Sequence, residues 1–160
     1  MERRTGGSLC GDIRFAADDE PRRTIACYCT FYQRFTGGGA FLVESLYYRK
    51  CVTFSGPALG TYEHQSDDSG RNLTLQFCRR CATTLGMHLE WNPRTQTILA
   101  GCLDDPNSVK AEIHLDTRSA RRDVWPPHDA VCYSKHFLLD DGSLDPSAVP
   151  IKADAPWRNP

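Results

Sequence analysis

The sequence lacks any apolar run near the roughly 20 residues that a membrane-spanning helix requires. It also lacks a large excess of positive charge, because 19 Lys and Arg residues face 20 Asp and Glu residues for a net charge of -1. Nucleic-acid-binding domains normally carry such an excess. The N-terminal segment has no apolar stretch typical of a secretory signal. We therefore expect a cytoplasmic protein with no nucleic-acid and no membrane partner, and the oligomeric state stays open.

Helical periodicity is poor throughout, whereas short β-type segments between glycine and proline breaks are frequent. This pattern predicts a mostly β fold with few short helices. We expect helical turns only at residues 31–35 and at residues 118–123, the second capped by Thr117. The expected strands cover residues 13–15, 24–28, 41–43, 52–54, 59–64, 73–77, 84–91 and 97–100.

The length of 160 residues fits one domain. The tail is rich in Asp, Pro, Ser and Ala. We expect a domain over residues 1–139 and a loosely docked C-terminal arm over residues 140–160.

Eight cysteines are unusual for a chain expected in a reducing compartment, where disulfides are rare. Metal binding is the first explanation to test. Cys78 and Cys81 form a Cys-x-x-Cys directly after an expected strand, which is half of a tetrahedral zinc site. The alternative, a redox dithiol, requires a βαβ setting and a following helix, and neither is apparent.

Cys27 and Cys29 form a Cys-x-Cys at the end of another expected strand. Side chains two apart on a strand point to the same face, so both thiols would face one place. They could ligate a metal ion or be two small buried apolar residues. For Cys51, Cys102 and Cys132, which are isolated in the sequence, a buried structural thiol is favoured.

Spacing alone permits two metal arrangements. One is a single site made by Cys27, Cys29, Cys78 and Cys81, and the other is two sites that also use Cys10. The five histidines show no paired ligand spacing and are better explained as structural or surface residues. The arginine doublets are best explained as solvated surface, with an anion-binding rim as the alternative.

The order of the motifs resembles the glutathione-dependent formaldehyde-activating (GFA) family, which also contains centromere protein V. The similarity runs from about Gly6 to about Phe137. The similar segments are residues 7–15 (Gly-x-x-Cys-Gly), 27–37 (Cys-x-Cys-x-x-Tyr), 77–85 (Phe-Cys-x-x-Cys-Ala-Thr), 100–106 (Ala-Gly-Cys-Leu-Asp-Asp-Pro) and 113–114, followed by Ser119 and Trp125.

This resemblance implies an Mss4-like folded β structure built around cysteine-liganded zinc. It implies a structural zinc at the positions of Ser8, Cys10, Cys78 and Cys81. It also implies a catalytic zinc with an open position, held at the positions of Cys27, Cys29 and Tyr32. Family members are described as carbon–sulfur lyases that promote formation of S-hydroxymethylglutathione from glutathione and formaldehyde, so a small thiol and an aldehyde are the implied partners.

Two departures from the family pattern fall on ligand positions. Ser8 replaces a cysteine, and a hydroxyl is a poorer zinc ligand than a thiolate. Tyr32 replaces the third catalytic cysteine, and a phenol with a pKa near 10 binds a metal only if the ion acidifies it. Ala82 replaces a glycine, which removes easy access to positive φ.

Two functions follow from these observations. The first is a zinc-dependent lyase acting on a thiol–aldehyde adduct, with Arg34 binding a substrate carboxylate. The second is a non-catalytic, zinc-stabilised binding protein that has lost the catalytic site. Tyr32 acting as an acid or base is a third chemical option.

Overall fold

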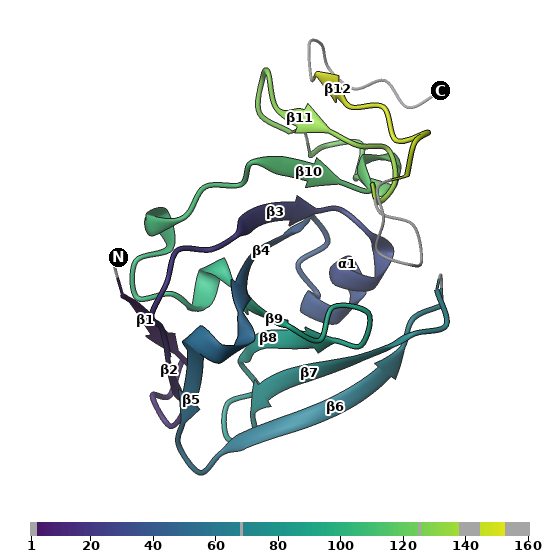
Figure 1. Cartoon of the computed structure of the whole chain (residues 1–160). Coiled ribbons are helices and arrows are strands. Elements are labelled where there is room, and N and C mark those ends of the chain that lie inside the picture. The colour runs from purple at the N-terminus through teal and green to yellow at the C-terminus, as the bar shows by residue number, and fades with distance from the viewer. Residues whose placement is uncertain (1–2, 68, 125, 138–144, 153–160) are drawn as a thin grey trace. The chain divides into compact units, whose positions relative to one another are not determined.

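A computed structural model of the chain describes residues 3–67, 69–124, 126–137 and 145–152. The chain divides into two compact units, one formed by Met1–Arg23 with Glu44–Lys110 and the other by Thr24–Val43 with Ala111–Pro160. Strands dominate both units, which confirms the mostly β fold (Figure 1). Within the described residues, no helix combines the length and the apolar character needed to cross a membrane.

The first unit contains a small antiparallel sheet in the order β1-β2-β5. Its strands are β1 (Arg4–Gly7), β2 (Arg14–Ala17) and β5 (Val52–Ser55). Gly6 of β1 leaves no room for a side chain, because a Cβ there would lie 2.1 Å from the carbonyl oxygen of Cys102. Close backbone approach therefore requires glycine at this point of the first motif.

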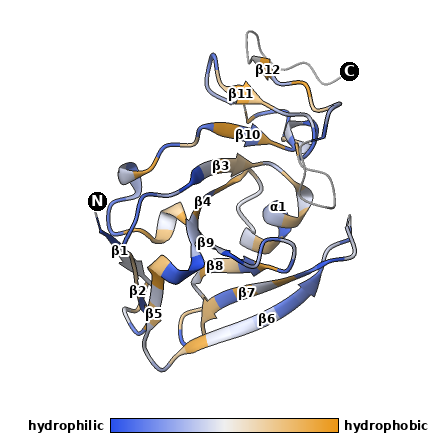
Figure 2. Ribbon diagram, in the orientation of Figure 1, coloured by the Kyte–Doolittle hydropathy of each residue, from blue (hydrophilic) through white to orange (hydrophobic). Residues whose placement is uncertain are grey.

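A second antiparallel array in the same unit runs β4-β9-β8-β7-β6. Its strands are β4 (Leu42–Tyr48), β9 (Thr95–Leu99), β8 (Thr84–Leu89), β7 (Asn72–Cys78) and β6 (Leu59–Gln65). Figure 2 shows β6 changing from orange at its start to blue toward its end. The exposed, polar side chains of this edge strand suit a position that must not pair with another chain.

The two sheets of the first unit supply a shared core. Its buried members are Ile13, Phe15, Ala17, Tyr47, Cys78, Leu85, Ile98 and Leu103. Cys78 is fully buried at the end of β7, so the sequence signal of alternating apolar residues leads directly from the core to the first thiol of the Cys-x-x-Cys.

The second unit contributes four neighbouring strands of the nine-stranded sheet, in the order β12-β11-β10-β3. Its strands are β12 (Ile151–Lys152), β11 (Val131–Cys132), β10 (Ile113–Leu115) and β3 (Arg23–Cys27). β3, β10 and β11 pair in parallel, and β11 and β12 are antiparallel. Of the expected arm over residues 140–160, only residues 145–152 lie in the described part of the chain.

Two helical segments of the second unit test the expected helices. The turn expected at residues 31–35 is confirmed as α1 (Thr30–Thr36), which ends at Gly37 in the left-handed region. The helix expected at residues 118–123 is wrong, because the structure has only the 3-10 turn η4 (Thr117–Ser119). Thr117 is inside this turn and does not cap it; Asp116, with φ of 55°, stands at the cap position.

Candidate metal centre

Three thiols of the first unit converge on one point. The Sγ atoms of Cys10, Cys78 and Cys81 all lie within 4.8 Å of one another, and no other group of three such donors occurs in the described residues. Cys78 is buried, Cys81 is half-buried and Cys10 is exposed, so the cluster sits at the edge of the core. Cys10 therefore joins the Cys-x-x-Cys, as one of the sites in the expected two-site arrangement requires.

Two turns position the thiols. After β1, the backbone N–H of Gly11 donates to the carbonyl of Ser8 at 2.9 Å, and this turn presents Cys10. After β7, the N–H of Ala82 donates to the carbonyl of Cys78 at 2.8 Å, which folds Cys81 back toward Cys78. Ala82 adopts a φ of 59°, the left-handed conformation that glycine occupies at lower cost.

Thr83 links the two turns. Its hydroxyl accepts a hydrogen bond from the backbone N–H of Leu9 at 3.1 Å and lies 3.2 Å from the Sγ atom of Cys81. The Thr83 hydroxyl, then the backbone N–H groups of Thr83 and Cys10, lower the pKa of Cys81 from 9.0 to about 6. A thiol that is mostly ionised at neutral pH is ready to ligate a metal ion.

The donor set fits zinc on chemistry and on spacing. Thiolate sulfur is the ligand that structural zinc sites use most. Two sulfurs at about 2.3 Å from a common tetrahedral centre would lie about 3.8 Å apart, and the Sγ atoms of Cys10 and Cys78 are 3.6 Å apart. The cluster can therefore hold a metal ion with three protein thiolates.

Ser8 lies beside the cluster, but its hydroxyl already forms hydrogen bonds with the backbone of Ile13. Its Oγ atom is 3.6 Å from the Sγ atom of Cys10. The same oxygen accepts a hydrogen bond from the backbone N–H of Ile13 at 3.1 Å, and the side chain is buried. The hydroxyl thus stabilises the turn that carries Cys10, and the three thiols remain the strong donors of the site.

The thiols expected at a second site lie in the other unit. β3 ends at Cys27, and Cys29 is the N-cap of α1, where its Sγ atom accepts from the backbone N–H of Tyr32 at 3.4 Å. Tyr32 itself is buried. The described residues contain no group of three Cys, His, Asp or Glu donors that includes Cys27 or Cys29, and the second zinc site stays a prediction.

Sequence reasoning missed Asp116. The Sγ atom of Cys27 donates to its carboxylate at 3.5 Å across 89 positions of the chain. Asp116 directly follows β10, which pairs with β3 in parallel with Leu115 opposite Cys27. A lone aspartate carries no spacing signal; in the structure, its contact with Cys27 and its left-handed backbone conformation mark it.

The remaining predicted residues have separate positions. Arg34 is exposed in the last turn of α1, and its substrate role stays a prediction. Cys51 donates to Asp19 at 3.9 Å, Cys102 to the Thr84 carbonyl at 3.0 Å and Cys132 to the Ala130 carbonyl at 3.5 Å. None of these three thiols belongs to the metal-binding group of the described residues, and burial raises the pKa of Cys102 to about 11.

A buried hydrogen bond accounts for His114. Its Nδ1 atom lies 3.0 Å from the hydroxyl of Tyr28. Burial raises the pKa of Tyr28 to about 12 and lowers the pKa of His114. The phenol therefore donates to a neutral imidazole, a structural role that agrees with the expectation for the histidines.

Together, the mostly β architecture and the three-thiol cluster define a β protein with a cysteine site that could hold a metal ion. The family model described as glutathione-dependent formaldehyde-activating enzyme matches residues 3–119, and the chain belongs to this family. The match confirms the resemblance through Ser119 and does not extend over the expected similarity up to Phe137; Trp125 also lies outside the described residues.

Comparison with curated proteins finds no match. Among solved structures, the chain is similar to a Rhodobacter sphaeroides protein determined as a structural genomics target. The identity is 18%, the TM-score is 0.49, and the similarity covers 65% of this chain and 93% of that one.

Proposed function

We propose that this protein is a zinc-binding, carbon–sulfur lyase-like member of its family that acts on the adduct of a small thiol, such as glutathione, with an aldehyde. The observation that carries the metal assignment is the convergence of Cys10, Cys78 and Cys81. The name of the family model supports the substrate class. The cysteine usage supports a reducing compartment, and we propose the cytoplasm.

In adduct formation, the thiol sulfur bonds to the carbonyl carbon, and the thiol proton finishes on the former carbonyl oxygen. Zinc, when bound by Cys10, Cys78 and Cys81, would supply Lewis acidity. Three protein ligands leave one position of a tetrahedral site for another donor, as in catalytic zinc sites. Ser8 keeps the loop that carries Cys10 in place through its bonds to Ile13.

The pair formed by Cys27 and Asp116 could take part in proton transfer. The carboxylate accepts the thiol hydrogen bond, so the two groups can hold a proton at the Sγ atom of Cys27. Cys29 and Tyr32 lie in the adjacent first turn of α1. We retain Cys27, Cys29 and Tyr32 as the proposed catalytic group without a metal ion, and Arg34 as the proposed carboxylate-binding residue.

The structure also favours a second candidate function, a non-catalytic binding protein stabilised by zinc. The observation behind it is the use of the Cys29 thiol as a helix cap beside a buried Tyr32. In that case the three-thiol cluster would maintain the fold, and Cys27 with Asp116 would serve only structure.

Exchange spectroscopy by NMR separates the two candidates. Glutathione and S-hydroxymethylglutathione interconvert spontaneously, so the enzyme must raise the exchange rate above that of buffer. The lyase proposal expects a rise that Cys27→Ser or Asp116→Asn abolishes and that Arg71→Gln, a charge change elsewhere, leaves intact. Exchange at the buffer rate with one zinc bound per chain would instead establish the binding protein.

The variant Tyr32→Cys tests whether the missing cysteine at position 32 limits zinc binding at the second site. It restores the family residue at the third position, so elemental mass spectrometry should find a second equivalent of zinc. Tyr32→Phe is the matched control and should bind no additional metal. If Tyr32→Cys binds no second equivalent, Cys27 and Cys29 have lost metal-binding geometry beyond this one residue.

A further inference from the structure

The end of β4 carries a cluster of cations around one tyrosine. A cavity of about 520 Å³ is lined by Tyr48, Arg49, Lys50 and Arg94. Arg22 stacks over the Tyr48 ring with its guanidinium carbon 4.6 Å from the ring centroid. The ammonium group of Lys50 lies 6.0 Å from the same centroid. Four positive side chains therefore surround one exposed aromatic ring.

Backbone pairing brings these residues together. Tyr48 pairs with Thr95 at the end of the β4–β9 ladder. One step further, the N–H of Arg49 donates to the carbonyl of Arg94 at 2.8 Å. On the other side, the N–H of Arg22 donates to the carbonyl of Leu46 at 2.7 Å. The cluster is thus fixed by the first unit alone, although its members are far apart in sequence.

A histidine orients one of the guanidinium groups. Nη1 of Arg49 lies 3.3 Å from Nε2 of His88, and Nδ1 of the same ring lies 3.4 Å from the carbonyl of Thr95. A carbonyl can only accept, so Nδ1 carries the proton and Nε2 accepts from Arg49. His88 thus holds Arg49 in place, and no ion pair in the described residues neutralises the charge of its guanidinium group.

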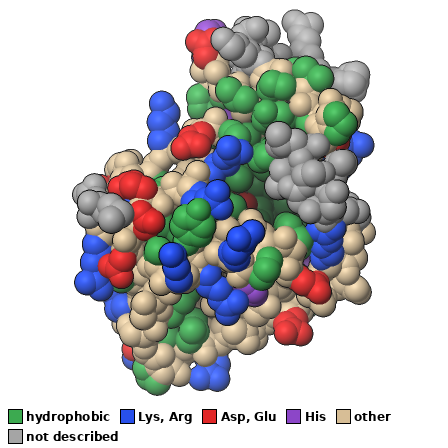
Figure 3. All heavy atoms as spheres, in the orientation of Figure 1, with side chains coloured by type: hydrophobic (Ala, Val, Ile, Leu, Met, Phe, Trp, Pro, Cys, Tyr) green, Lys and Arg blue, Asp and Glu red, His purple; other side chains and the backbone are tan. Residues whose placement is uncertain are grey.

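The absence of ion pairs in the described residues distinguishes this cluster. In the described residues, no ion pair involves Arg22, Arg49, Lys50 or Arg94. The other ion pairs of the same unit each join an arginine to a carboxylate: Arg3 to Asp18, Arg4 to Glu20, Arg14 to Asp104 and Arg80 to Asp12. Figure 3 shows blue side chains gathered on one face of the molecule, over the segment that joins β4 and β5.

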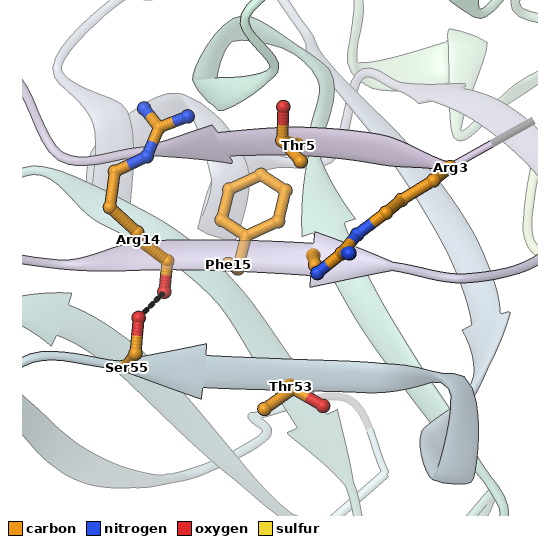
Figure 4. Close-up of a pocket in the computed structure, with 7 residues that line it drawn as sticks. Arg3, Thr5, Arg14, Phe15, Thr53 and Ser55 are labelled. Atoms are coloured by element: carbon orange, nitrogen blue, oxygen red, sulfur yellow. Dashed lines mark hydrogen bonds between the residues drawn. The ribbon is translucent and has the colours of Figure 1, made fainter.

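A second pocket of about 370 Å³ provides the contrast. It lies on the β1-β2-β5 sheet and contains Arg3 and Arg14 (Figure 4). Both arginines are neutralised, Arg3 by Asp18 at 3.1 Å and Arg14 by Asp104. Of these two cavities, the one at Tyr48 is lined by cations that form no ion pair with a carboxylate of the described residues.

We propose that the cavity lined by Tyr48, Arg49, Lys50 and Arg94 binds a phosphate-bearing small molecule. Like charges gathered at one point repel one another, and a multiply charged anion removes that repulsion. A phosphate group carries close to two negative charges at neutral pH and offers three acceptor oxygens. Arginine forks and a lysine ammonium are the groups that recognise it. The cavity volume lies in the range of small-molecule sites.

Inorganic pyrophosphate is the probe for this site, and isothermal titration calorimetry at low and at physiological ionic strength is the measurement. We expect binding that weakens as salt rises, because the site is exposed. The double variant R49Q/R94Q should weaken binding by about tenfold or more. Arg71→Gln removes one charge elsewhere in the same unit and should leave the affinity unchanged.

The variant Arg94→Lys keeps the charge and removes the planar fork, and we expect an intermediate loss. Three results would overturn the proposal. The first is pyrophosphate binding equally well to R49Q/R94Q and to the wild type, and the second is a loss of affinity in Arg71→Gln as large as that in R49Q/R94Q. Citrate or glutathione binding this cavity more tightly than pyrophosphate would assign it to carboxylates. Thermal unfolding of each variant confirms that the fold persists.

Discussion

The Sγ atoms of Cys10 and Cys78 lie 3.6 Å apart, although 68 positions separate the two residues in the chain. Cys10 lies in the turn after β1, and Cys78 is the last residue of β7. An ion that binds both closes a long loop, and closing a long loop removes conformational entropy from the unfolded chain. The cluster thus couples metal binding to the stability of the first unit.

Cys78→Ser should therefore destabilise the protein as it removes zinc. If zinc is present at about 1,000 times its dissociation constant, binding contributes about 4 kcal/mol to the free energy of unfolding. Chemical unfolding with and without a chelator measures this contribution. The chelator should act on Cys102→Ser as on the wild type and have little effect on Cys78→Ser. A full equivalent of zinc in purified Cys78→Ser would contradict the assignment.

Ser8→Cys should strengthen zinc binding by at least about tenfold, because a fourth thiolate replaces a weakly donating hydroxyl. The side chain already lies 3.6 Å from Cys10, so the new sulfur needs no large backbone movement. Competition with a chromophoric chelator measures the affinity. Ser8→Ala is the control, and it should keep one equivalent of zinc; if it loses the metal, the hydroxyl is a required ligand.

Thr83→Val should raise the pKa of Cys81, because the Thr83 hydroxyl is the largest cause of its lowering to about 6. In the metal-free protein, this lowered pKa stabilises the folded state fully above pH 9, the ordinary cysteine value, and the contribution is lost as pH falls through about 6. The alkylation rate of Cys81 at neutral pH, followed by peptide mass spectrometry, should fall in this variant.

Thr61→Val, the same substitution on exposed β6, is the control for that experiment and should leave the alkylation rate of Cys81 unchanged. An unchanged rate in Thr83→Val would show that the backbone N–H donors alone lower the pKa of Cys81.

Ala82→Gly should stabilise the protein by about 1 kcal/mol, because Ala82 has a φ of 59° and glycine adopts this conformation without a Cβ clash. Urea unfolding measures the change. Ala58→Gly is the matched control: Ala58 has no positive φ and packs against the core, so the same substitution should destabilise there. A loss of stability in both variants would contradict the strain at Ala82.

Much of the fold could be predicted because local signals and tertiary pairing agree. The alternation of Leu73, Leu75 and Phe77 predicts β7, and the structure places the strand at Asn72–Cys78. β10 and β11 carry no such signal, since they have three and two residues and exist through parallel pairing with distant strands. Short strands of this kind depend on partners that sequence alone does not reveal.

The candidate site, like the fold, could be predicted only in part from the sequence. The Cys-x-x-Cys spacing identifies Cys78 and Cys81 as a pair, and the family resemblance adds Cys10 to it. The contact between Cys27 and Asp116 has no spacing signal, because it depends on the register of two parallel strands. The cluster of cations around Tyr48 could not be predicted from the sequence either, because it is the β4–β9 pairing that brings Arg49 to Arg94.

The division of the chain has a consequence for the order of events during synthesis. The first unit is complete once Lys110 has been made, whereas the second unit needs segments on both sides of that point. β3 leaves the ribosome early, yet its parallel partner β10 begins only at Ile113. The nascent chain therefore carries β3, with Cys27 at its end, before its parallel partner β10 exists, while the first unit can already fold. The second unit consequently depends on late translation, and a ribosome stalled before Ile113 would leave β3 without its parallel partner.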